Sequence, residues 1–312
     1  MANLENLVLI DPEILSGISD MHEKVSAHAK YHEALREKET LSLYQESTVN
    51  SARLEQELMA RHDEKNATRN LSKEKLEKKA KNIGIQVQNA WNYATANFKG
   101  KITQDLIVAM GNLIDPFANQ EKTLRIVGKQ GGGGGNTGKR SVPTPDKVAM
   151  YLPKLMEEWN EGYILHKKFD DASERTPITP VERAAYAHMM TFIMQPLYDG
   201  NKRTGRMLQN LILQSAHLPP AIIYGPENSE YMAKLTAAQD GYDNRGAGDC
   251  PGQLFSPEER NFFDFIGKRV LISLQRTDDI LTGNVTPVFG ADAKPDDKGL
   301  NQLPLFESEQ KS

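Results

Sequence analysis

Residues 179–206 read TPVERAAYAHMMTFIMQPLYDGNKRTGR, and this stretch decides the interpretation of the chain. Thr179 can cap a helix whose first turn accepts Pro180. Apolar residues then recur at helical spacing, a proline and a glycine interrupt them, and a second helical pattern follows at 202–216. The sequence therefore predicts two helices joined by a short loop. The buried stripe of the first helix is expected to consist of Val181, Ala184, Ala185, His188 and Phe192, and that of the second of Leu208, Leu211 and Ile212.

The start of the second helix has the residue types of a phosphate site. Free amides at a helix N-terminus and the helix dipole favour an anion, and Gly200 lets a ligand approach the backbone. Arg203 and Arg206 are three residues apart and share a helix face. Asp199 offers the kind of oxygen ligand that Mg²⁺ combines with phosphate oxygens. The pattern predicts a polyphosphate site; taken alone, it also fits an ordinary capped helix with surface arginines.

Composition limits the class of protein. The chain has 312 residues, a net charge of −4, 38% hydrophobic and 26% charged residues, and one cysteine, Cys250. The charge disfavours direct nucleic-acid binding by bulk charge, and a single cysteine excludes an intramolecular disulfide. No apolar run approaches the roughly 20 residues that a membrane span needs, and the start lacks the basic residues of a signal peptide. A cytoplasmic protein without a membrane contact is expected.

Three regions are predicted along the chain. Residues 1–80 form an N-terminal helical region, 81–276 a core, and 277–312 a polar tail that is expected to be disordered. Within the core, 123–143 combine short extended pieces with a glycine run, which indicates a hairpin-like excursion. Further helical patterns lie at 75–115, 146–162, 228–240 and 257–276.

Residues 195–206, QPLYDGNKRTGR, resemble the motif of the Fic family, His-x-Phe-x-(Asp/Glu)-Gly-Asn-Gly-Arg-x-x-Arg. The flanks resemble the family as well: 180–196 its helix before the motif, 219–239 its segment over the adenine, and 125–148 its flap. The resemblance covers roughly residues 40–275. It implies a mainly α fold, with a Fic-type helical core and a small β-hairpin flap that docks a target protein. Matching positions are Asp199, Gly200, Asn201, Arg203 and Arg206; departures are Gln195 for histidine, Leu197 for phenylalanine and Lys202 for glycine.

Fic proteins mostly transfer AMP from ATP to a hydroxyl of a target protein. The resemblance therefore implies ATP and Mg²⁺ as cofactors, with Asp199 on the metal and Gln195 at the position of the general base. A glutamine amide cannot take a proton near pH 7, whereas an imidazole can, and such catalysis is typically worth about 10²–10⁴-fold. Either the chain is a naturally degenerate member, or the histidine was replaced on purpose to tame a toxic or trapped enzyme; a bacterial, toxin-like protein is expected. Nucleotide contacts are implied for Gly200, Asn201, Lys202, Arg203, Arg206 and Tyr231.

An upstream segment resembles the inhibitory helix that many Fic proteins carry, with the pattern (Ser/Thr)-x-x-x-Glu-(Gly/Asn). Here a helix around 44–58 contains Ser51 and Glu55, with Gln56 as a departure from the pattern. The resemblance implies that Glu55 pairs with Arg206 and holds ATP in a pose unsuited to attack. The alternative is a helix with one more surface glutamate.

Two other functions stay open. Lys202 is typical of the Doc branch, which transfers a phosphate, although Arg206 is typical of the AMP branch. A non-catalytic module that binds a nucleotide or a partner is the second alternative. His188 lies about 10 Å along the helix axis from position 195, so it is expected to be a core histidine.

Two partners are further predictions. QLPLF in the tail resembles the peptide with which bacterial replication proteins bind the DNA sliding clamp. The residues concerned are Gln302, Leu303, Leu305 and Phe306. A homodimer is also compatible with the sequence.

Overall fold

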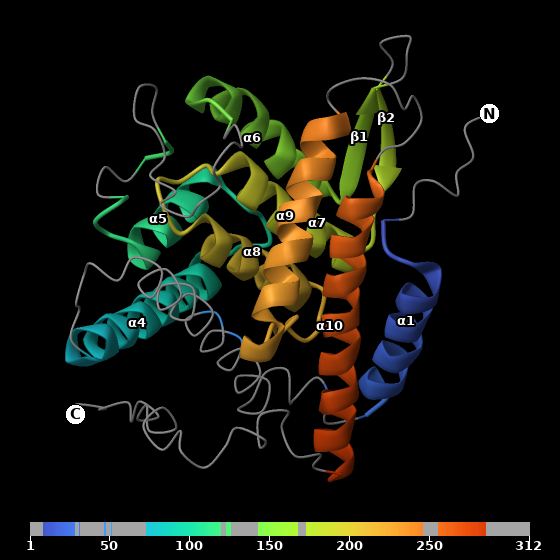
Figure 1. Ribbon diagram of the computed structural model, residues 1–312. Coiled ribbons are helices and arrows are strands. Elements are labelled where there is room, and N and C mark those ends of the chain that lie inside the picture. The colour runs from blue at the N-terminus through green and yellow to red at the C-terminus, as the bar shows by residue number, and fades with distance from the viewer. Residues whose placement is uncertain are drawn as a thin grey trace.

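The computed structural model describes residues 9–28, 31, 47, 51, 73–119, 123–125, 143–167, 173–245 and 255–284. Within these ranges the fold is mainly α, with one small antiparallel sheet (Figure 1), as the sequence predicts. The helices are α1 (Pro12–Ser26), α4 (Lys73–Asn97), α5 (Gln104–Ile114), α6 (Pro145–Glu161), α7 (Pro180–Met194), α8 (Asn201–Ser215), α9 (Asn228–Arg245) and α10 (Pro257–Thr282), and the strands are β1 (Tyr163–Lys167) and β2 (Ser173–Pro177).

The expected helices of the core are present. Two of them run past the boundaries expected for the core, residues 81 and 276. Helix α4 continues without a break through residue 80. Helix α10 extends to Thr282, beyond residue 276, and ends at Gly283, whose φ of 76° suits a glycine at a helix C-terminus. Two residues of its last turns, Thr277 and Leu281, are still buried or packed against the core, which explains why the helix continues.

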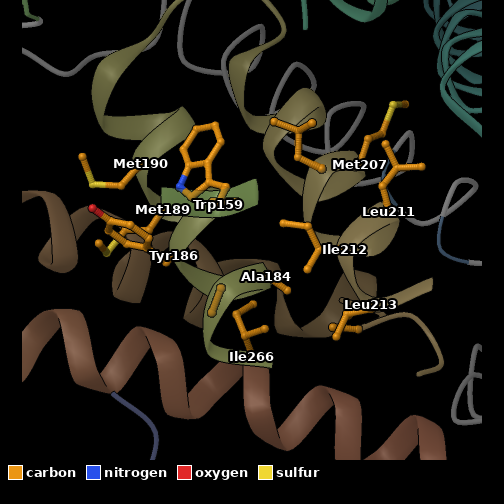
Figure 2. Packing of buried hydrophobic residues seen from close by; sticks show 14 of the residues in the cluster. Trp159, Ala184, Tyr186, Met189, Met190, Met207, Leu211, Ile212, Leu213 and Ile266 are labelled. Carbon is orange, nitrogen blue, oxygen red and sulfur yellow. The ribbon is translucent and has the colours of Figure 1, made fainter. Parts of the chain in front are cut away.

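Helix α7 lies at the centre of the fold. Thr179 and Glu182 form a capping box at its start, with Pro180 in the first turn. All five residues of the predicted stripe are buried, and the burial extends around the helix to every residue from Val181 to Met194 except Arg183. The helix is covered on several sides by α6, α8, α9 and α10 (Figure 2), and polar side chains such as His188 are therefore buried with the apolar ones.

Helices α7 and α8 approach each other closely at one point. A Cβ added at Gly205 would lie 3.0 Å from the carbonyl oxygen of His188 and 2.9 Å from its ring. Because the first of these contacts involves backbone, a larger residue at position 205 would push the helices apart. This crossing fixes where the first turn of α8 lies relative to the last turns of α7.

The two-stranded sheet is a hairpin that the sequence analysis did not predict. Strands β1 and β2 pair antiparallel, with Tyr163 opposite Pro177, and the Arg175 guanidinium lies 4.4 Å from the centre of the Tyr163 ring. The strands are short and β2 is polar, so they lack the apolar alternation on which a strand prediction depends. The predicted hairpin at 123–143 lies outside the described residues except for 123–125 and Pro143.

The N-terminal part of the described chain packs against the C-terminal helix. Helix α1 lies beside α10 (Figure 1), where a Cβ at Gly267 would meet Ile10 and Ile14. The backbone N–H of Leu9 donates to Glu182 Oε1 at 2.9 Å, so the start of α1 is also tied to the capping box of α7. None of the described helices is long and apolar enough to cross a bilayer.

Candidate functional site

A loop of six residues, 195–200, joins α7 to α8 and contains the first half of the motif. Gln195 ends α7 in the left-handed conformation, with φ 44° and ψ 61°, and its N–H donates to the Thr191 carbonyl at 3.1 Å. Gln195 is half-buried. Position 195 is thus the C-cap of α7, where the chain turns toward α8.

The Asn201 side chain holds the middle of this loop. Its Oδ1 accepts from the Leu197 N–H at 2.9 Å, and its Nδ2 donates to the Leu197 carbonyl at 2.9 Å. Leu197 is buried and packs where Gly111 of α5 has no side chain. The motif asparagine therefore shapes the loop, and its predicted contact with a nucleotide would have to come from its main chain.

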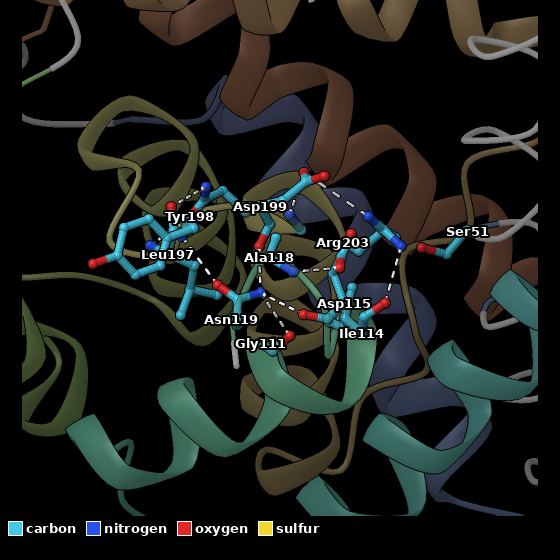
Figure 3. A network of polar contacts seen from close by, with 12 residues as sticks. Ser51, Gly111, Ile114, Asp115, Ala118, Asn119, Leu197, Tyr198, Asp199 and Arg203 are labelled. Atoms are coloured by element: carbon cyan, nitrogen blue, oxygen red, sulfur yellow. Dashed lines mark hydrogen bonds and ion pairs between the residues drawn. The ribbon is translucent and has the colours of Figure 1, made fainter. Parts of the chain in front are cut away.

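Asp199 precedes α8 by two residues and Arg203 lies in its first turn (Figure 3). Between them, Gly200 caps the helix with φ 81°, and a Cβ there would lie 2.7 Å from Ile114, so both its conformation and its packing require glycine. Arg203 is buried, donates to the Ile114 carbonyl at 3.3 Å, and lies 3.9 Å from Asp199 Oδ1. The Asp199 side chain is 50% exposed. This turn therefore carries one carboxylate open to solvent and a helix N-terminus without a side-chain cap.

Arg206 lies one turn further along α8 and is buried beneath another segment. Its Nε donates to Ser51 Oγ at 2.8 Å and its Nη2 donates to the Ser51 carbonyl at 3.2 Å. Its Nη1 donates to the Tyr231 hydroxyl at 3.2 Å. Arg206 is 6% exposed and Ser51 5% exposed. The resemblance paired Glu55 with Arg206; in the structure, Ser51 of the same predicted segment contacts Arg206 directly.

Tyr231 and His188 continue this chain of hydrogen bonds into the core. His188 Nδ1 lies 2.7 Å from Gln209 Oε1 and Nε2 lies 3.0 Å from the Tyr231 hydroxyl. Since the amide oxygen can only accept, the ring carries its proton on Nδ1 and accepts from Tyr231 at Nε2. Burial lowers the pKa of His188 to about 3; the bond to Gln209 opposes this shift and Arg206 adds to it. His188 is a neutral core histidine, as expected.

Ser47 makes a second contact of the same kind with α8. Asn210 Nδ2 donates to Ser47 Oγ at 2.7 Å. The two serines are four residues apart, as are Arg206 and Asn210 on α8. Two positions one helical turn apart therefore contact two positions one turn apart on α8. A small pocket beside them is lined by Ser47, Ser51, Val87, Trp91, Arg206, Met207 and Asn210.

The site suits a metal only together with another ligand. No group of three or more His, Cys, Asp or Glu side chains among the described residues is arranged to hold an ion. The half-exposed carboxylate of Asp199 supplies one oxygen, and Mg²⁺ is commonly held by one or two carboxylates plus phosphate oxygens and water. The residues present therefore fit Mg²⁺ bound with a polyphosphate at the start of α8.

Comparison with known proteins decides the family. The model of the Fic/DOC family matches residues 52–213, which include α7, the loop and most of α8. The chain belongs to the Fic/DOC family. The resemblance of the motif is thus confirmed at the level of the family.

Curated relatives are protein adenylyltransferases from animals. Protein adenylyltransferase fic-1 of Caenorhabditis elegans is 44% identical over 102 residues, which are 33% of this chain and 18% of that protein. Protein adenylyltransferase Fic of Drosophila persimilis is 36% identical over 99 residues, 32% of this chain and 17% of that protein. The chain thus matches less than a fifth of the length of these relatives.

Solved structures share the Fic fold. Fic-1 (residues 134–508) of C. elegans superposes with a TM-score of 0.58 at 21% identity, over 87% of this chain and 73% of that one. A Fic domain containing signaling protein of Bacteroides thetaiotaomicron gives a TM-score of 0.55 at 18% identity, over 86% of this chain and 97% of that one. The fold is therefore found in animal and bacterial members of the family.

Two polar residues that no pattern in the sequence indicates, Asn119 and Arg125, hold the loop 195–200. Asn119, which is 1% exposed, donates to the carbonyls of Gly111 at 2.9 Å and Asp199 at 3.1 Å and accepts from the Tyr198 N–H at 3.0 Å (Figure 3). Arg125 bonds the other end of the loop. Their partners in the loop lie 70 and 80 residues away in sequence, so no local pattern indicates these contacts. Other predicted site residues, Glu55, Gln302, Leu303, Leu305 and Phe306, lie outside the described residues.

Proposed function

We propose that this chain has the site of a Fic-type protein adenylyltransferase. Its activity is restrained by an N-terminal segment and impaired by Gln195. The observation that carries the proposal is the contact of Ser51 with Arg206, because the same arginine that would hold a phosphate is occupied by the predicted inhibitory segment. The names of the curated relatives support AMP transfer as the reaction.

The nucleotide is assigned to the start of α8. The α- and β-phosphates would lie against the amides after Gly200 and against Arg203, with Mg²⁺ on Asp199. Arg206 would receive the γ-phosphate once it is released from Ser51. Lys202, in the same turn, adds a positive charge beside the phosphates. Bound Mg²⁺ would neutralise phosphate charge and orient the α-phosphorus toward the hydroxyl of the target protein.

Residue 195 is assigned the proton transfer. The left-handed backbone of Gln195 is a conformation that histidine adopts more readily than most residues, so an imidazole suits this position. Glutamine retains a polar side chain but cannot take the proton of the attacking hydroxyl. The expected result is a protein that binds ATP and transfers little of it.

Inhibition is assigned to the segment that contains Ser47 and Ser51. Their contacts with Asn210 and Arg206 follow α8 toward its N-terminus. On the helix that the sequence predicts around 44–58, Glu55 follows on the same face one turn later, toward the phosphate site. A carboxylate there would compete with phosphate for the arginines.

Phosphate transfer of the Doc type is the second candidate, and Lys202 at the position of the motif glycine favours it. A target protein bound at residues 123–143 and a sliding clamp bound at the tail remain further proposals for partners.

The deciding experiment places a general base at position 195. Gln195→His should raise self-modification with ATP by about 10²–10⁴-fold, the usual size of general-base catalysis. ATP labelled on the α-phosphate reports AMP transfer, and label that transfers only from the γ-phosphate reports the Doc-type reaction. Gln195→Asn is the matched control, since it supplies a side-chain amide but no base.

Relief of inhibition is tested in the same assay. Glu55→Gly combined with Gln195→His should transfer more label than Gln195→His alone, whereas Glu57→Gly, two residues away, should not add to it. If the double variant binds ATP but neither label reaches any protein of a cell lysate, the enzymatic proposal is wrong and the chain is a binding module.

A further inference from the structure

The backbone at position 195 is held in a conformation that needs support. Gln195 is one of two non-glycine residues with positive φ among the described residues; the other is His217. A left-handed residue at a helix end leaves the last carbonyls of the helix to find partners elsewhere. Two carbonyls at this end of α7 are those of Met194 and the cap residue Gln195, and their partners determine how residue 195 is presented.

One side chain satisfies both carbonyls. Arg125 Nε donates to the Gln195 carbonyl at 3.0 Å, and Nη2 donates to the Met194 carbonyl at 3.4 Å. The same Nη2 also donates to the Pro143 carbonyl, and the Arg125 N–H donates to the Pro196 carbonyl at 2.9 Å. Arg125 is 6% exposed, so these bonds are shielded from water.

The rest of the loop depends on other residues. Both main-chain polar groups of Leu197 bond to the Asn201 side chain. Asn119 holds the N–H of Tyr198 and the carbonyl of Asp199. The loop therefore has three supports with separate targets: Asn201 holds Leu197, Asn119 holds the end where Asp199 lies, and Arg125 holds the end where residue 195 lies.

Arg125 and Pro143 also flank the segment 126–142, which contains most of the predicted flap. Because one guanidinium bonds Pro143 on one side and Gln195 on the other, it ties both ends of that segment to the end of α7. The planar fork of arginine can reach three carbonyls at once, which a lysine ammonium on a flexible stem cannot do with the same geometry.

We propose that Arg125 is a positioning residue that fixes the backbone of residue 195, and with it the direction of the side chain there, which takes the proton when that residue is a histidine. The consequence for catalysis rests on the proposed function; the consequence for the backbone does not. Position 195 should therefore loosen when the fork is lost, while the nucleotide contacts at the start of α8 stay in place.

The test compares Arg125→Lys in the parent and in the Gln195→His background. Amide hydrogen exchange in peptides covering residues 190–199 should become about tenfold faster in Arg125→Lys, with α10 peptides unchanged. In the Gln195→His background, kcat for label transfer should fall about 10- to 100-fold, while KM for ATP changes less than about twofold. Arg175→Lys is the matched control, since Arg175 lies on β2, is 63% exposed, and should leave all three quantities unchanged.

Each outcome decides the proposal. Equal exchange at 190–199 in Arg125→Lys and the parent overturns it, as does equal kcat in the two Gln195→His proteins. If Gln195→His transfers no label, the proposed function has failed and hydrogen exchange alone decides the role of Arg125. If Arg125→Lys does not fold, Arg125→Gln, which keeps two donors and removes the charge, replaces it in both measurements.

Discussion

The two ends of the motif on α8 differ in their access to solvent. Asp199, just before the helix, has half of its side chain exposed, whereas Arg206 is 6% exposed and bonded to Ser51 and Tyr231. A ligand could reach the first end without moving the described residues, but it could use Arg206 only after Ser51 leaves. One helix can therefore carry a part of a site that is open to solvent and a part that another segment covers.

The largest expected difference between the two ends is in their response to acid. His188 belongs to the covered end, and its pKa is lowered to about 3 in the folded protein, compared with 6.5 ordinarily. Above pH 6.5 the ring is neutral in both states; below it, only the unfolded chain takes up the proton. Stability should thus be lost as the pH falls from 6.5 toward 3, by about 2 kcal/mol between pH 7 and pH 5.

Urea unfolding at pH 7, 6 and 5 measures this loss. His188→Gln should reduce the slope with pH, although it lowers stability at every pH. His217→Asn is the control, because His217 is exposed and asparagine accepts its left-handed backbone. An unchanged slope in His188→Gln would show that other groups cause the acid sensitivity.

A smaller effect is expected when the hydroxyl that joins Arg206 to His188 is removed. Tyr231→Phe keeps the buried ring but leaves Arg206 Nη1 and His188 Nε2 without this partner. The free energy of unfolding should fall by about 1–2 kcal/mol. Tyr93→Phe, at a tyrosine that is 38% exposed, should change it by less than about 0.5 kcal/mol. Similar losses in the two variants would contradict the distinction between covered and open side chains.

The smallest effect on stability is expected at the open end. Asp199→Asn should change the free energy of unfolding by less than about 0.5 kcal/mol, because the carboxylate is half exposed and its ion pair with Arg203 is long. The same variant should weaken ATP binding in the presence of Mg²⁺ and leave it nearly unchanged in EDTA, as measured by calorimetry. ATP binding that is equally strong with Mg²⁺ in Asp199→Asn and the parent would place the metal elsewhere.

Local sequence predicted the elements of the site better than the contacts between them. The cap at Thr179, the break before Gly200 and the helix after it follow from turn and cap preferences within a few residues. The contacts of Arg125 and Asn119 do not, because burial and distant chain segments create them. The burial of α7 on several sides was missed for the same reason: its apolar stripe says nothing about how many neighbours the fold supplies.

The predicted inhibitory segment is a different case. The resemblance paired Glu55 with Arg206, and in the structure Ser51 of the same predicted segment bonds Arg206 at 2.8 Å. A helical pattern alone would have left Ser51 as one polar residue among many. Glu55, on which the inhibitory role depends most, lies outside the described residues and stays a prediction.

The contact between Ser51 and Arg206 also has a consequence for synthesis. The two residues are separated by 155 positions, and the serine comes first. A chain grows from its N-terminus, so the ribosome releases the segment around Ser51 well before α8 is complete. Ser51 is therefore already synthesised when Arg206 folds into place, whereas a partner encoded after the motif would be synthesised later. In this order of synthesis, Arg206 can bond Ser51 from the moment α8 forms.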